Sequence, residues 1–121
     1  MTGPVTVSCA RCGGIAAALS LHPAAVEQMP SRHGLQRAGF MGQVTKFGDG
    51  AELRSLLEAI RAADYAAARR VDADFIAFHC RECGSCYCER CWRIGPPEFD
   101  EGFYDCTRAI CPQGHEQIVD D

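Results

Sequence analysis

The amino-acid sequence predicts a small α+β domain that is stabilised by zinc, with short antiparallel strands around cysteine turns and one inserted amphipathic helix. Three observations lead to this fold class. Nine cysteines occur in 121 residues, and most of them are grouped at the spacing of metal ligands. One segment shows a clear helical stripe of leucine and isoleucine. Several short apolar segments are bounded by glycine or proline, which is typical of strands.

The length and composition limit the class of protein. A chain of 121 residues is expected to form a single zinc-binding domain over residues 1–121. We expect a cytoplasmic protein, because no signal peptide or membrane span is recognisable. In a reducing compartment nine cysteines are better explained as metal ligands than as disulfides. A net charge of −4 and a single lysine disfavour nucleic acid as a partner.

The densest group of cysteines lies between residues 79 and 92, which we call the cysteine centre. It contains two Cys-x-x-Cys pairs, Cys80/Cys83 and Cys88/Cys91. At this spacing a tight turn brings two thiolates to one tetrahedral ion, at about 2.3 Å from the metal. Cys86 lies between the pairs and is too close to Cys88 for an ordinary metal-binding turn.

A third pair, Cys9/Cys12, comes near the start and is followed by Gly13 and Gly14. The glycines can adopt the positive φ that turns backbone amides toward a thiolate. Residues 15–21 (IAAALSL) then favour a strand, as in zinc ribbons, although the alanines also suit a helix.

The middle of the chain, residues 23–74, is predicted to be a helical insertion. Residues 23–39 have a weak pattern and are expected to form a loop, with one helical turn near 24–28. Residues 40–47 suggest a short strand. Asp49 can then cap a helix, with Glu52 as the second half of a capping box. This helix is expected over about 51–63, and either it extends to 72 or Asp64 starts a second helix. Its apolar stripe consists of Leu53, Leu56, Leu57 and Ile60.

The remaining segments are expected to surround the metal-binding core, which we place at residues 9–14 and 79–121. Residues 75–78 are predicted to be a strand that enters the cysteine centre, and residues 92–94 a strand that Gly95-Pro96-Pro97 ends. Further apolar cover is expected from three aromatic residues, Phe99, Phe103 and Tyr104.

The fourth ligand pair is predicted to be Cys111/His115, with Cys106 as the competing ligand. Its spacing is one residue longer than that of the other pairs, but Pro112 and Gly114 suit a tight turn. Four pairs supply eight ligands and therefore hold two tetrahedral zinc ions. Spacing alone allows the pairs to combine in three ways. The predicted ligands are Cys9, Cys12, Cys80, Cys83, Cys88, Cys91, Cys111 and His115.

The C-x2-C-x4-C-x2-C core of the cysteine centre resembles the middle of a PHD finger, and Cys111-Pro112 is similar to the start of the last RING pair. In these cross-brace zinc fingers the first and third pairs hold one ion, and the second and fourth pairs hold the other. The resemblance therefore implies one ion bound by Cys9, Cys12, Cys88 and Cys91 and a second bound by Cys80, Cys83, Cys111 and His115. The chain departs from the family in residues 13–79, which are far longer than the corresponding loop, and in ending the last pair with histidine.

Three functions fit these observations. Eight ligands leave no open coordination position, and no catalytic motif is recognisable, so no catalytic residue is predicted. The favoured function is a non-catalytic adaptor in which two zinc ions fix loops that present apolar residues to a protein partner, namely Trp92, Ile94, Phe99, Phe103 and Tyr104. A RING-like ligase adaptor for a ubiquitin-like conjugation system is the alternative that the resemblance implies. A third is a thiol redox or metal-responsive protein, in which oxidation of the crowded cysteines releases zinc.

Overall fold

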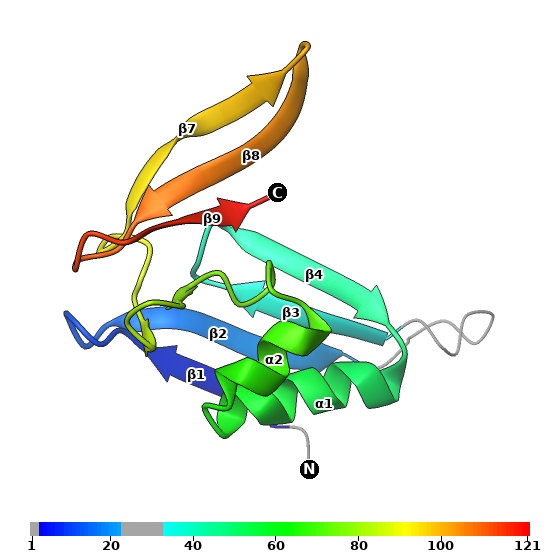
Figure 1. The fold of residues 1–121 in the computed structure, drawn as a ribbon. Coiled ribbons are helices and arrows are strands. Elements are labelled where there is room, and N and C mark those ends of the chain that lie inside the picture. The colour runs from blue at the N-terminus through cyan, green and yellow to red at the C-terminus, as the bar shows by residue number, and fades with distance from the viewer. Residues whose placement is uncertain (1–2, 23–32) are drawn as a thin grey trace.

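The computed structural model describes residues 3–22 and 33–121 and shows an α+β arrangement with three antiparallel sheets. The largest sheet has the strand order β1-β2-β3-β4 (Figure 1). Each strand pairs antiparallel with its neighbour in sequence. Its strands are β1 (Val5–Ser8), β2 (Ile15–His22), β3 (His33–Ala38) and β4 (Gln43–Gly48).

The strand predicted after the first cysteine pair is confirmed as β2, whose small and apolar side chains Ala16, Ala17 and Leu19 are buried. The loop predicted for residues 23–39 is wrong over His33–Ala38, which form β3. The local sequence does not predict this strand, because Arg37 is a charged residue at a buried strand position. It is accommodated there by residues that are distant in the sequence. Its Nη1 donates to the carbonyl oxygens of Asp74 (3.3 Å) and Phe75 (2.9 Å). The helical turn predicted near 24–28 lies outside the described residues.

The predicted amphipathic helix is confirmed as α1 (Gly50–Arg61). The Asp49 carboxylate accepts hydrogen bonds from the backbone N–H groups of Ala51 and Glu52 and so caps the first turn. The helix ends at Arg61, and Asp64 caps a separate helix, α2 (Tyr65–Val71). The chain therefore follows the second of the two alternatives, a break and a new helix.

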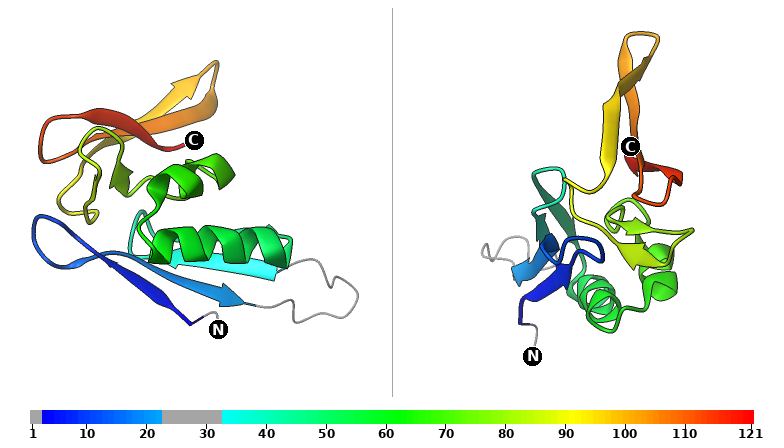
Figure 2. Two further views of the ribbon diagram at one scale, coloured as in Figure 1. Left: turned by 60° about the horizontal axis from the view of Figure 1, so that its bottom comes forward. Right: turned by 90° about the vertical axis from the view of Figure 1, so that its left-hand side faces the viewer.

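The main core lies between α1 and the four-stranded sheet (Figures 1 and 2). The helix contacts β1, β2 and β3, and all members of its apolar stripe are buried. Leu19 and Leu35 face the same core from the sheet. Residues 23–74 are thus more than the expected helical insertion, because they also supply β3 and β4. The sheet that they complete starts with the strands on either side of the first cysteine pair.

The segment that leads into the cysteine centre is buried but is not the predicted strand. Phe75, Ile76 and Phe78 are almost fully enclosed, yet the backbone forms successive turns there. These apolar side chains are buried, but the backbone does not pair with another strand among the described residues. A short apolar segment of this kind has the composition of a buried strand, which is why the sequence predicts one here. A two-stranded pair follows, formed by β5 (His79–Cys80) and β6 (Ser85–Cys86).

The third sheet has the order β7-β8-β9 and contains a hairpin that projects from the rest of the molecule (Figure 2, right). Its strands are β7 (Arg93–Asp100), β8 (Phe103–Ile110) and β9 (Glu116–Asp120). The prediction that Gly95-Pro96-Pro97 ends the strand is wrong. Strand β7 is an edge strand and its ladder is irregular between Ile94 and Pro97, and both conditions accommodate proline, which has no N–H to donate.

The aromatic residues of this hairpin do not supply the predicted apolar cover, and Trp92, which is predicted to face a partner, is instead buried. Phe99 is 65% exposed, Phe103 78% and Tyr104 43%. They lie near the Glu101-Gly102 turn at the far end of the hairpin, beyond the reach of the main core.

Candidate metal centre

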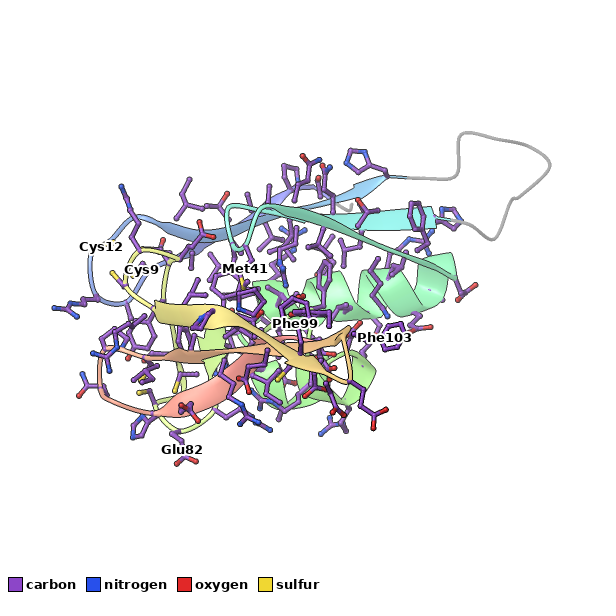
Figure 3. All side chains as sticks on the ribbon, turned by 90° about the horizontal axis from the view of Figure 1, so that it is seen from above. Cys9, Cys12, Met41, Glu82, Phe99 and Phe103 are labelled. Carbon is purple, nitrogen blue, oxygen red and sulfur yellow. The ribbon has the colours of Figure 1, made fainter. Side chains whose placement is uncertain are left out.

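The structure brings the predicted ligands together in two groups. Site 1 consists of Cys9, Cys12, Cys88 and Cys91, and site 2 of Cys80, Cys83, Cys111 and His115. Within each group the four ligand atoms all lie within 4.8 Å of one another, so each group could hold a metal ion. Figure 3 shows Cys9 and Cys12 at the turn between β1 and β2.

The distances within both sites fit a tetrahedral ion of the size of zinc. Metal–sulfur bonds of about 2.3 Å and metal–nitrogen bonds of about 2.0–2.1 Å place tetrahedral ligands about 3.8 Å (S···S) and about 3.6 Å (S···N) apart. The Sγ atoms of Cys12 and Cys88 are 3.6 Å apart, and so are those of Cys83 and Cys111. The Nδ1 atom of His115 lies 3.2–3.9 Å from the three sulfurs of site 2. His115 therefore faces the sulfurs through Nδ1.

Tight turns hold the ligands of each pair in place. Gly13 and Gly84 directly follow the second cysteines of the first two pairs and have φ values of 76° and 72°, which are costly for a residue with a side chain. Their N–H groups close the turns onto the carbonyl oxygens of Cys9 and Cys80. Backbone amides also point at the sulfurs, as in Gly14 N to Cys12 Sγ at 3.4 Å.

The Cys111/His115 pair is held by a turn of the same kind, with one more residue between the two ligands. The backbone N–H groups of Gln113 and His115 point at the Sγ atom of Cys111, at 3.3 and 3.4 Å. The Gly114 amide closes the turn onto the carbonyl oxygen of Cys111. The longer spacing is therefore compatible with a ligand pair.

The electrostatics of both sites favour a bound cation. Burial raises the pKa of the Cys9 thiol, but the N–H groups of Cys12 and Cys88 outweigh it and bring the pKa to about 6. In the same site burial and the neighbouring sulfurs raise the pKa of Cys91 to about 12. Site 2 shows the same difference between its thiols. Burial is outweighed at Cys111 by the backbone N–H groups of His115 and Gln113, which lower its pKa to about 7, whereas burial raises the pKa of Cys80 to about 11. A thiolate in each site thus opposes ionisation of the next, and a divalent cation removes this repulsion.

The two sites are joined by short contacts through the cysteine centre. The backbone N–H of Ala10 donates to the carbonyl oxygen of Cys86 at 2.8 Å, which ties the first turn to the centre. Gln117, in β9, ties the other end, because its Nε2 donates to the carbonyl oxygens of Ala77 and His79 at 3.0 and 2.9 Å. Its Oε1 accepts from the backbone N–H of Arg81. Sequence reasoning missed Gln117, which carries no local signal.

Cys86 and Cys106 lie outside both groups. Cys86 is buried beside Tyr65, and burial is the largest effect that raises its pKa. Cys106, the competing ligand, lies on β8 in register with Glu98.

His79 is buried, stacks on Tyr65, and its Nδ1 contacts the Arg69 guanidinium at 2.9 Å. His22 is exposed and contacts Ser20 and Gln36.

The comparison with protein-family models finds one family, described as a domain of unknown function (DUF8328), whose model matches residues 1–121. The chain belongs to the DUF8328 family. No curated protein and no solved structure matches this DUF8328 domain. In the described part of the domain, no helix is long and apolar enough to cross a membrane.

Proposed function

We propose that the DUF8328 domain is a protein-interaction module without catalysis of its own, in which two structural zinc ions hold the binding surface in place. The donor sets support zinc, because four thiolates, or three thiolates and an imidazole, are typical of structural zinc sites. Each ion would have four protein ligands and no position for water or substrate. A site of this kind contributes to folding and to shape.

The observation that carries the proposal is the attachment of the projecting hairpin to both sites. Strand β7 begins at Arg93, two residues after Cys91 of site 1. Strand β8 ends at Ile110, directly before Cys111 of site 2. Two bound metal ions would therefore fix the two strands at the base of the hairpin, which matters because a two-stranded ribbon alone is only marginally stable.

The far end of the hairpin has the composition of a contact surface. Phe99 and Phe103 are exposed there, and Figure 3 shows both of them at the hairpin. Exposed aromatic side chains are enriched at protein interfaces, where they provide much of the binding energy. The neighbouring Asp100, Glu101 and Asp105 give the tip a negative charge, which favours a partner with a basic rim.

The experiment compares two positions for a photoreactive side chain, Phe103 on the tip and Phe47 on β4, which is also exposed (62%). We expect Phe103 to cross-link in cells to a partner that Phe47 does not capture. The purified partner should then bind the wild type and Phe47→Ser with equal affinity and Phe99→Ser/Phe103→Ser at least tenfold more weakly. Equal affinity for all three proteins would contradict the proposal.

A second candidate function is a RING-like ligase adaptor. One observation favours it: the first and third pairs form site 1, and the second and fourth pairs form site 2, which is the cross-brace grouping. The test is the discharge of a ubiquitin-like protein from its charged conjugating enzyme with and without the domain. Faster discharge supports this candidate, and an unchanged rate removes it.

A further inference from the structure

A surface cavity of about 150 Å³ lies away from the hairpin tip, between the end of α2, the second cysteine turn and β9. Two arginines, Arg69 and Arg81, and two aspartates, Asp74 and Asp121, line it. Apolar residues, among them Ile76 and Ile118, and the buried His79 also line it. Gln117 also lines it and is fixed by its three hydrogen bonds to residues 77–81.

The arginine side of the cavity has no neutralising partner. Arg69 is half-buried, and its Nη2 donates to the Nδ1 of His79 at 2.9 Å. An imidazole that accepts this hydrogen bond is neutral, so it holds the guanidinium in place but does not compensate its charge. Burial and then the nearby charge of Arg81 lower the pKa of Arg69. Within the described residues neither arginine forms an ion pair. Two guanidinium groups that line one cavity without a counter-charge could bind an anion, because their N–H groups suit a carboxylate.

The aspartate side has the opposite imbalance. Burial, followed by repulsion from Asp121, Asp72 and Asp120, raises the pKa of Asp74. Neither Asp74 nor Asp121 forms an ion pair in the part of the chain that the structure describes. Positive and negative groups thus line one cavity without meeting. A simple anion would be attracted by one side and repelled by the other.

We propose that this cavity binds a small dipolar ligand with a carboxylate and an ammonium group joined by a short apolar chain, as in an ω-amino acid. The carboxylate would bind Arg69 and Arg81, and the ammonium group would bind Asp74 and Asp121. The chain between them would lie against Ile118, which is partly exposed. Both charged ends of such a ligand find partners in the cavity. The site is independent of the hairpin surface.

The test is a ¹H–¹⁵N NMR titration of the full chain as purified with glycine, β-alanine, 4-aminobutyrate and 5-aminovalerate. Acetate and methylammonium, alone and together, serve as probes of each single charge. We expect saturable shifts at Arg69, His79, Arg81 and Gln117, with affinity greatest at one chain length and at least tenfold above that of either single charge. No saturable binding by any amino acid, or equal binding of acetate, would overturn the proposal.

Variants separate the site from general surface charge. Arg69→Gln and Asp74→Asn should each weaken binding of the best amino acid about tenfold, the usual effect of removing one charge-assisted hydrogen bond. Arg70→Gln is the matched control, because Arg70 is the exposed neighbour on α2 and does not line the cavity. Metal content and the dispersion of the remaining signals establish that each variant is folded. An equal loss in Arg70→Gln would also overturn the proposal.

Discussion

The indole Nε1 of Trp92 donates a hydrogen bond to the carbonyl oxygen of Phe78 at 3.2 Å. Trp92 directly follows Cys91, the last cysteine of site 1, and Phe78 lies two residues before Cys80, the first cysteine of site 2. Both side chains are buried, and the ring of Trp92 also packs edge-on against Tyr87. This side-chain-to-backbone hydrogen bond therefore connects the chain segments next to the two sites inside the core.

We expect Trp92→Phe to lower the free energy of unfolding by about 1 kcal/mol, because the hydrogen bond is lost while most of the packing remains. Trp92→Ala should cost about 3–5 kcal/mol through the cavity that it leaves. Denaturant unfolding with zinc present measures both values. Equal losses in the two variants would contradict this division between hydrogen bond and packing.

Cys111 and Cys106 provide a matched pair of buried cysteines for the ligand set. Cys111→Ala should retain one zinc ion per chain, because site 2 loses a thiolate. Cys106→Ala should retain two ions, since Cys106 lies outside both groups. Metal analysis of protein purified without chelator gives the ratios. The reverse result would show that Cys106 is the ligand.

The single histidine of the two groups, His115, should distinguish the two sites spectroscopically. With ¹¹³Cd in place of zinc, we expect two resonances, one from four sulfurs and one from three sulfurs and a nitrogen. His115→Cys should shift only the second resonance toward the first. Movement of both resonances, or of the four-sulfur resonance alone, would contradict the assignment of His115 to site 2.

Zinc binding should release protons at pH 7.5. The Cys9 thiol, with a pKa of about 6, is already a thiolate at this pH. Cys80 and Cys91, whose pKa values are about 11 and about 12, are protonated without metal and must lose their protons to bind it. Apparent zinc affinity should therefore rise with pH. Calorimetry in two buffers of different ionisation enthalpy measures the release, and equal heats would contradict it.

The cap of α1 offers a prediction that is independent of metal. Asp49→Ala removes the carboxylate that accepts from Ala51 and Glu52 and should lower the free energy of unfolding by about 1 kcal/mol. Asp49→Asn, which keeps an acceptor, should cost less. Thermal unfolding compares the two. A larger loss in the Asn variant would rule out capping as the cause.

Features that depend on neighbouring residues can be predicted from the sequence alone. The spacing of Cys9/Cys12 and Cys80/Cys83 and the glycines after them encode turns whose hydrogen bonds close within a few residues. Asp49 and the apolar stripe after it likewise encode α1, because a cap and a helical period are local properties.

Other features depend on residues that are distant in the sequence and become visible only in the folded chain. Strand β3 includes Arg37, which is buried by the carbonyl oxygens of Asp74 and Phe75. Strand β7 continues through Pro96 and Pro97 because it is an edge strand, which no local pattern reveals. The spacing of the four ligand pairs allowed three combinations, and the resemblance favoured one of them. In the structure the packing of chain segments that lie far apart in the sequence brings that combination together.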